Sequence, residues 1–250
     1  MECLEDRIVS VVAGGASGIG EAVVRKLVDR GDKVIIIDKD RRNGERVSQA
    51  TGAEYHFADI TDPASIRLVA ERIASISPHY INHLAVTAGG VYQKHEGSVF
   101  EEVPDEEFKA SVELNLFGPF YLIKNFLPSM KAAPEGQHKS ITLPGSSNME
   151  GGYGLVPYSS AKAGLVGLAR SSVDELGRHG ITINVVEIGG TKTPALPERL
   201  YPSIEQRSPL KRMNTPDDVA GVYRFLASPE ARNITGAVIP VNFGQTIARR

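Results

Sequence analysis

The chain has 250 residues, of which 41% are hydrophobic, so it is long enough to bury one sizeable core. Its 28 basic and 30 acidic residues give a net charge of −2, which argues against a nucleic-acid or other polyanionic partner. The single cysteine, Cys3, excludes an intrachain disulfide. No apolar run is long enough to span a bilayer, and the acidic N-terminal segment lacks the apolar core of a signal peptide. We therefore expect a cytoplasmic protein without a membrane partner.

A strand–turn–helix–strand pattern comes first. Residues 8–12 form an apolar, β-branched run that is typical of a buried parallel strand, and residues 34–37 form a second one. Between them, apolar residues recur at helical spacing, which predicts a helix over 18–30. The turn before this helix is rich in glycine, with the spacing Gly14-x-x-x-Gly18-x-Gly20.

This turn indicates a dinucleotide site. A pyrophosphate must approach the backbone N–H groups at a helix N-terminus, where the macrodipole favours negative charge, and a Cβ there would hold it away. Asp38, after the second strand, can accept hydrogen bonds from the adenosine ribose and would repel a 2′-phosphate, which favours NAD over NADP. Lys39, Arg41 and Arg42 could reach such a phosphate, but we interpret them as the solvated start of a helix over 41–51.

The third and fourth predicted strands both end in residues that suit the expected cofactor site. Residues 54–58 form the third strand, and Asp59 follows it, where an acid can accept a hydrogen bond from the adenine amino group. An amphipathic helix is predicted over 63–77. The fourth strand, over 81–87, ends in two small residues that let the backbone pass beside the cofactor's ribose.

A buried asparagine is predicted in the next helix. After a polar loop over 91–104, acidic residues at a helix start and a long apolar pattern predict one helix over 105–130. Asn115 lies inside it between apolar neighbours, and Asn is unfavourable in mid-helix and costly to bury without partners. We interpret it as a buried functional residue; the alternative is an Asn that faces solvent.

The last three predicted strands cover 139–143, 181–186 and 237–241. Ser146 follows the first of these strands, at the sheet edge where open parallel sheets bind ligands. The segment after the second strand has no readable periodicity, and we expect a substrate lid over about 190–212.

Tyr158 and Lys162 open a helix that is predicted to reach residue 178. Because they are four residues apart, they lie on one helical face. A lysine ammonium beside a phenol would lower the pKa of the Tyr158 phenol, so that it could exchange a proton with an alcohol near neutral pH. The six histidines show no metal-ligand spacing, so no metal site is expected.

Together these features resemble the short-chain dehydrogenase/reductase family, of the classical type, over nearly the whole chain. The matching positions are Gly14, Gly18, Ile19, Gly20, Asp59, Ile60, Thr61, Asp62, Ala88, Gly89, Asn115, Gly118, Tyr158, Lys162, Asn184, Gly189, Thr193, Pro209, Leu210, Arg212 and Pro216. The resemblance implies one doubly wound, Rossmann-like α/β domain over residues 1–250, with a seven-stranded parallel sheet, helices on both faces, and assembly as a homotetramer or homodimer. It also implies hydride transfer between NAD(H) and an alcohol or ketone, the EC 1.1.1 type of reaction.

The resemblance also gives the site residues their roles. Tyr158 would be the proton donor and acceptor, Lys162 would lower its pKa and bind the nicotinamide ribose, and Asn115 would hold a water in the proton relay. Thr191 and Thr193 would contact the carboxamide and the phosphates. The implied cofactor-binding residues are Gly14, Ser17, Gly18, Ile19, Gly20, Asp38, Asp59, Ile60, Ala88, Gly89, Tyr158, Lys162, Gly189, Thr191 and Thr193.

Some positions depart from the family pattern. The serine that helps to polarise the substrate carbonyl falls at Gly145 in this chain; a shift of one residue would let Ser146 serve, with Ser147 as second choice. The other departures are Ala13 for Thr, Val86-Thr87 for Asn-Asn, Ile188 for Pro, and Asn242-Phe243 for Asp-Gly. The lost Thr and Asn side chains would remove hydrogen bonds that brace the turns, at about 1 kcal/mol each.

Three functions remain open on these residues. The leading one is an NAD(H)-dependent oxidoreductase that acts on a small-molecule alcohol or ketone. The drifted motif positions motivate an alternative, a member that binds NAD(H) without catalysis, and a third is a non-redox reaction with the same proton-transfer groups. The intact Tyr158, Lys162 and Asn115 favour the enzyme.

Overall fold

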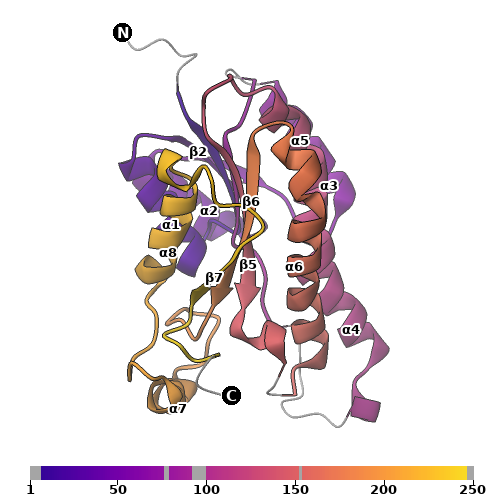
Figure 1. The fold of residues 1–250 in the computed structure, drawn as a ribbon, viewed down its shortest axis with the longest axis vertical. Coiled ribbons are helices and arrows are strands. Elements are labelled where there is room, and N and C mark those ends of the chain that lie inside the picture. Colours follow the sequence, from indigo (N-terminus) through magenta and orange to yellow (C-terminus); the bar gives the residue numbers. More distant parts are fainter. Residues whose placement is uncertain (1–6, 76–78, 92–99, 152–153, 247–250) are drawn as a thin grey trace.

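Seven parallel strands, rich in the aliphatic residues expected of strands buried on both faces, form the centre of the molecule (Figure 1). The computed structural model describes residues 7–75, 79–91, 100–151 and 154–246. The strands are β1 (Val9–Ala13), β2 (Lys33–Asp38), β3 (Glu54–Phe57), β4 (His83–Val86), β5 (Lys139–Ser146), β6 (Ile181–Ile188) and β7 (Val238–Val241). Their order is β3-β2-β1-β4-β5-β6-β7, so the chain reverses its direction across the sheet between β1 and β4, the point where open sheets of this kind bind ligands. The predicted fold class is confirmed.

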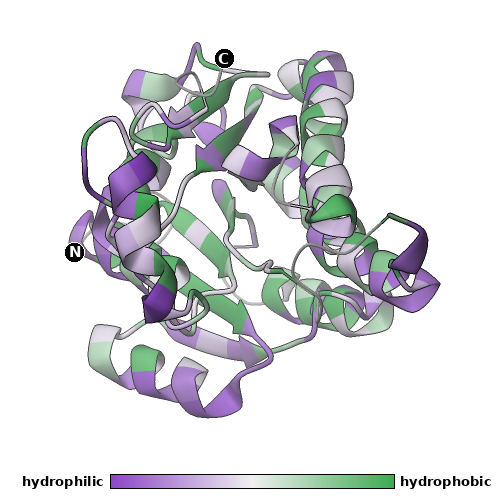
Figure 2. Cartoon of the chain, turned by 90° about the horizontal axis from the view of Figure 1, so that it is seen from below, coloured by the Kyte–Doolittle hydropathy of each residue, from purple (hydrophilic) through white to green (hydrophobic). Residues whose placement is uncertain are grey.

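Helices cover both faces of the sheet (Figure 1). The α-helices are α1 (Gly18–Asp29), α2 (Arg41–Thr51), α3 (Pro63–Ala74), α4 (Asp105–Val112), α5 (Gly118–Lys131), α6 (Val156–Gly177), α7 (Tyr201–Arg207) and α8 (Pro216–Leu226), and the short turns are η2 (Phe100–Glu102), η3 (Glu113–Phe117), η4 (Ser147–Glu150), η5 (Glu198–Leu200) and η6 (Pro229–Ala231). α1, α2 and α8 bury apolar side chains such as Val24 and Val219 on one face, and α3, α5 and α6 bury others such as Phe126 and Leu165 on the opposite face. Figure 2 shows the apolar strands between these two helical layers.

The predicted helix over 105–130 is confirmed as a continuous helical run, but it contains a π-helical turn between α4 and α5 that was not predicted. The π-helical turn, η3, contains Asn115, whose side chain bonds to the backbone of a neighbouring loop. An inserted π-turn of this kind is common at functional sites. The pattern of apolar residues does not reveal it, because one extra residue changes the helical period very little.

Several other boundaries also differ from the predictions. β5 continues to Ser146, since the pairing of Ser146 with Ile188 of β6 extends the ladder. The last residues of the predicted helix over 63–77, most of the polar loop over 91–104, and Cys3 with the acidic N-terminal segment lie outside the described residues. In the part of the chain that the structure describes, no helix has the length and apolar character needed to cross a membrane.

A buried histidine lies on β4, and it gives the first testable prediction. His83 is enclosed by the sheet, its Nδ1 lies 2.9 Å from the Ser140 hydroxyl, and its ring lies 5.5 Å from that of His138. Burial, with the positive charge of Arg30 and the neighbouring His138, lowers the pKa of the His83 imidazole well below its usual value. His83 is therefore neutral in the folded protein near pH 7.

Because the folded-state pKa of His83 lies below the unfolded value of about 6.5, the unfolded chain takes up the proton first as the pH falls. The contribution of neutral His83 to the free energy of unfolding is complete above pH ~6.5. It should be lost on acidification, at up to about 1.4 kcal/mol per pH unit for this proton. Urea denaturation at pH 7 and pH 5 should show a smaller loss of unfolding free energy in His83→Phe than in the wild type. The exposed His179→Phe should match the wild type, and equal losses in all three proteins would contradict the prediction.

Candidate active site

A pocket of about 780 Å³ opens at the carboxyl ends of the strands. It extends along the sheet from residues that follow β2 and β3 to residues that follow β6. Sixteen of the seventeen residues expected from the sequence line it: Gly14, Ser17, Gly18, Ile19, Gly20, Asp38, Asp59, Ile60, Ala88, Gly89, Ser146, Tyr158, Lys162, Gly189, Thr191 and Thr193. The exception is Asn115, which is fully buried behind the wall of the pocket.

The glycine-rich turn is packed so closely that side chains cannot replace its hydrogens. A Cβ on Gly20 would lie 1.9 Å from the Gly14 carbonyl oxygen, and a Cβ on Gly14 would lie 2.4 Å from the Ala88 backbone nitrogen. Gly14 and Gly18 also have positive φ angles of 91° and 53°. Bare backbone at the N-terminus of α1 therefore faces the pocket, and this arrangement fits the pyrophosphate of a dinucleotide.

Thr87 supplies hydrogen bonds that brace the glycine-rich turn, although the sequence predicts that such bonds are lost. Its hydroxyl donates to the carbonyl oxygens of Ala13, at 3.0 Å, and Gly14, at 3.2 Å. The expected loss of bracing hydrogen bonds at Ala13 and Thr87 is therefore wrong for this turn, because the threonine side chain comes from the residue after β4 instead of from β1.

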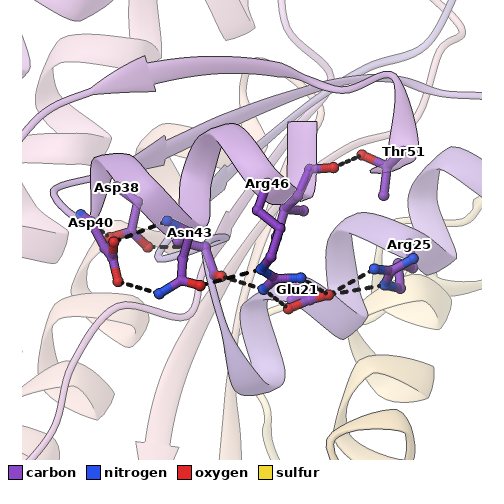
Figure 3. A network of polar contacts seen from close by, with 9 residues as sticks. Glu21, Arg25, Asp38, Asp40, Asn43, Arg46 and Thr51 are labelled. Atoms are coloured by element: carbon purple, nitrogen blue, oxygen red, sulfur yellow. Dashed lines mark hydrogen bonds and ion pairs between the residues drawn. The ribbon is translucent and has the colours of Figure 1, made fainter. Parts of the chain in front are cut away.

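Asp38 also braces the turn. One carboxylate oxygen accepts from the Ala16 N–H at 3.0 Å, and the other accepts from the Asp40 N–H at 2.9 Å. Figure 3 shows Asp38 and Asp40 at one end of a polar network over α1 and α2, in which Arg46 binds Glu21. Both oxygens of Asp38 thus already have backbone donors.

Asp59, the residue expected to bind the adenine, also has hydrogen-bond and ion-pair partners within the protein. Asp59 accepts from the backbone N–H and the hydroxyl of Thr61, and its second oxygen lies 3.2 Å from the Lys39 ammonium. Lys39 itself lines the pocket beside Asp38. This end of the pocket therefore presents a lysine charge together with two carboxylates.

Tyr158 and Ser146 come together in the middle of the pocket. Tyr158 lies in the first turn of α6, and its side chain is hydrogen-bonded to that of Ser146 at the end of β5. A Cβ on Gly145 would lie 2.6 Å from Val185 Cγ1, which explains why glycine occupies the position where the family pattern has serine. Of the two serines left open by the sequence, Ser146 is the one bonded to Tyr158.

Lys162 is buried beneath Tyr158, but it does not lower the pKa of that phenol as expected. Its ammonium donates to the Pro144 carbonyl oxygen at 2.7 Å and lies 5.6 Å from the centre of the Tyr158 ring. Burial raises the pKa of Tyr158, and the hydrogen bond with Ser146 offsets part of that rise. Burial also lowers the pKa of Lys162 to about 7.

Asn115 fixes the loop that forms the adjoining wall. Its amide nitrogen donates to the carbonyl oxygens of Gly90, at 2.9 Å, and Ser111, at 3.0 Å, and its oxygen accepts from the Gly90 N–H at 3.0 Å. A Cβ on Gly89 would lie 2.9 Å from both Asn115 Oδ1 and Lys162 Nζ. Asn115 and Lys162 therefore meet directly behind Gly89.

The far end of the pocket contains residues that sequence reasoning missed. Thr191 is buried and donates to the Gly189 carbonyl oxygen at 2.9 Å, while Thr193 lies beside Gly18. Leu196, Leu200, Ile204 and Arg207 line the pocket from the segment predicted as the lid, and the lining residues that were not predicted include Asn148, Leu155 and Gln245. No local motif marks them, since they come together only when α7 and the C-terminal segment fold over the sheet. Among the described residues, no group of three or more His, Cys, Asp and Glu side chains could hold a metal.

Comparison with known proteins assigns the chain to a family. A family model described as enoyl-(acyl carrier protein) reductase, one of the short-chain dehydrogenase/reductase models, matches residues 14–246. The chain belongs to the short-chain dehydrogenase/reductase family. The expectation drawn from the glycine turn, Tyr158 and Lys162 is thereby confirmed at the level of the family.

Relatives in the short-chain dehydrogenase/reductase family match almost the whole chain. The 3-oxoacyl-[acyl-carrier-protein] reductase FabG of Escherichia coli (strain K12) is 31% identical over 94% of this chain and 96% of its own length. An acetoacetyl-CoA reductase of Synechocystis is also 31% identical, over 96% of each chain. The crystal structure of an oxidoreductase of the family from Burkholderia thailandensis is 32% identical, with a TM-score of 0.85 over 96% of this chain and 93% of that one. These likenesses support a general reductase role.

The relatives correct the expected preference for NAD. FabG and the acetoacetyl-CoA reductase are NADPH-dependent, and this contradicts the expected preference for NAD. The expectation rested on the Asp38 carboxylate, which would accept hydrogen bonds from the ribose and repel a 2′-phosphate. In the structure each Asp38 oxygen accepts one backbone N–H group, and Lys39 lines the pocket beside it.

Proposed function

We propose that this protein is a carbonyl reductase that transfers hydride from NADPH to a ketone or aldehyde, with Tyr158 as the proton donor. The observation that carries the proposal is the meeting of Tyr158, Ser146 and Lys162 in the same pocket as the glycine-rich turn. When bound, the reduced nicotinamide supplies the hydride. Residues 190–212, including α7, would serve as the substrate lid, and a homodimer or homotetramer is the proposed assembly.

The side chains divide the proton chemistry between them. The hydroxyls of Tyr158 and Ser146, which are bonded to each other, would hold the substrate carbonyl oxygen, and Tyr158 Oη would donate its proton to that oxygen as negative charge develops. Lys162 has a pKa of about 7, so it can return a proton to Tyr158 near neutral pH. Asn115 would act as a positioning residue, because it fixes the Gly89–Gly90 backbone against Lys162.

The nucleotide end of the pocket supports the proposed cofactor. The glycine turn offers bare backbone for the pyrophosphate, and Lys39 offers a charge that could bind a 2′-phosphate. The Asp38 carboxylate opposes such a phosphate by its charge. The balance between these two side chains would therefore set the degree of preference for NADPH.

This balance gives the second prediction. Lys39→Ala should raise the Kd of NADPH about tenfold, since a charge-assisted hydrogen bond to phosphate is lost, and should leave the Kd of NADH nearly unchanged. Asp38→Asn keeps an acceptor oxygen for the turn and removes the charge, so the ratio of NADPH to NADH affinity should rise. Fluorescence titration of both cofactors measures these constants, with the remote, exposed Lys124→Ala as control. A wild-type protein that binds NADH more tightly than NADPH would overturn the proposed cofactor.

The proposed activity is tested with purified protein, NADPH and a panel of ketones and aldehydes, by following the loss of reduced-nicotinamide absorbance. We expect turnover with at least one class of carbonyl compound. Tight binding of NADPH without turnover across the panel would favour the alternative of a nucleotide-binding member without catalysis.

A further inference from the structure

The two ends of the pocket differ in charge. Two acidic residues line it among those the structure describes: Asp38, which ends β2, and Asp59, which follows β3, both at one end of the pocket. β6 and β7 lie on the opposite side of the sheet, and Arg207 lines the pocket there. The wall on this side is otherwise largely apolar, with Leu155, Leu196, Leu200 and Ile204. The Arg207 guanidinium therefore lies at the end of the pocket that is opposite Asp38 and Asp59.

Arg207 is held in this position by its own helix. It is the last residue of α7, its Nε donates to the Ser203 carbonyl oxygen at 3.1 Å, and its Nη2 lies 3.4 Å from the Ser203 hydroxyl. α7 packs on the backbone after β6, because a Cβ on Gly190 would lie 2.7 Å from Ile204 Cγ2. The guanidinium is thus attached to an element that closes the pocket.

The C-terminal segment adds a polar side chain to the same pocket. Gln245 is buried and lines the pocket, and its backbone N–H donates to the Asn242 carbonyl oxygen at 2.9 Å. A buried junction holds this segment to the sheet: the Asn242 amide donates to Glu187 at 2.5 Å and lies 2.7 Å from the Thr246 hydroxyl, which also bonds to Glu187. Gln245 is therefore presented from a fixed backbone.

We propose that Arg207, assisted by Gln245, binds an anionic group of the substrate, so that the substrate is a carbonyl compound with a carboxylate or a phosphate at a distance from its reacting carbon. The proposal rests on the proposed reductase function. A guanidinium presents a planar fork of N–H donors that matches the oxygens of either anion, and an apolar wall suits the carbon chain between the two groups. Asp38 and Asp59 at the opposite end would repel the anionic group, and so would disfavour the reversed orientation of the substrate.

The test compares anionic substrates with neutral partners that have the same carbonyl. The pairs are 3-oxohexanoate with methyl 3-oxohexanoate, and dihydroxyacetone phosphate with dihydroxyacetone; the pair that shows the larger ratio identifies the anion. We expect wild-type kcat/KM to be higher for the anion, and Arg207→Met to lower it about 10- to 100-fold while leaving the neutral partner nearly unchanged. Arg207→Lys should restore part of the effect, because it keeps the charge without the fork. Arg199→Met, also on the lid but not lining the pocket, should match the wild type.

A second measurement separates this inference from the proposed function. Calorimetry on the NADPH-loaded protein should show that both Arg207→Met and Gln245→Ala weaken binding of the favoured anion, with the Kd of NADPH unchanged. Anion binding that depends on Arg207 but is never followed by turnover would contradict the reductase and retain the anion site. Turnover with equal losses for anion and neutral partner, no wild-type preference for the anion, or a weakened Kd for NADPH in Arg207→Met would each overturn the anion site.

Discussion

Tyr158→Phe is expected to lower kcat for carbonyl reduction by about three orders of magnitude. The substitution removes one hydroxyl, which is the group proposed to donate the proton, and general acid catalysis is worth about 10²- to 10⁴-fold. The ring stays in place at the start of α6, so the Kd of NADPH should change less than about twofold. Stopped-flow or steady-state reduction of the best substrate, combined with fluorescence titration of the cofactor, measures the two quantities separately.

Tyr80→Phe is the matched control. Its hydroxyl bonds to the backbone of Arg7, and neither residue lines the pocket, so its removal should leave kcat unchanged. If Tyr158→Phe retained wild-type turnover, the proton would have to come from another group and the proposed roles of Ser146 and Lys162 would lose their basis. A parallel loss of cofactor affinity would mean that the phenol acts in binding.

Gly20→Ala is expected to have the largest effect on the nucleotide end. The new methyl group would lie 1.9 Å from the Gly14 carbonyl oxygen, and that oxygen belongs to a turn which cannot move without disturbing β1 and α1. Overpacking of this kind costs about 3 kcal/mol at the upper end of its usual range. We therefore expect a loss of that order in the free energy of unfolding, together with loss of measurable NADPH binding.

Gly221→Ala provides the opposite expectation. Gly221 lies inside α8, and nothing lies within 4 Å of a Cβ built there. Alanine should stabilise this helix by about 0.5–1 kcal/mol and leave cofactor binding intact. Urea denaturation measures the free energy of unfolding of both variants, and titration with NADPH measures their cofactor binding. Equal stability of Gly20→Ala and the wild type would show that the turn accommodates a side chain.

The sequence was informative where a short segment determines its own environment. The glycine turn, the buried strands and the Tyr158–Lys162 spacing are local patterns, and each leads to the arrangement that the structure shows. The choice between Ser146 and Ser147 depends on how far β5 remains paired with β6, which is a property of two strands that are distant in sequence.

The errors have a common physical origin in partners that lie far along the chain. The backbone donors of Asp38, at Ala16 and Asp40, are fixed only by the folded turn, so the sequence alone does not show them. The sequence does not show the bracing by Thr87, because Thr87 follows β4 and reaches the end of β1 only in the fold. Arg207 and Gln245 come from the lid and the C-terminal segment, and their common pocket exists only in three dimensions.

The described part of the chain begins and ends on opposite sides of the molecule (Figure 1), and Gly244, after β7, lies beside Pro209, which follows α7. Since Glu187, Asn242 and Thr246 draw the C-terminal segment into the wall of the pocket, a fusion partner attached there would crowd the substrate entrance. Affinity tags for kinetic work therefore belong at the N-terminus, since the chain enters β1 at the amino ends of the strands, away from the pocket.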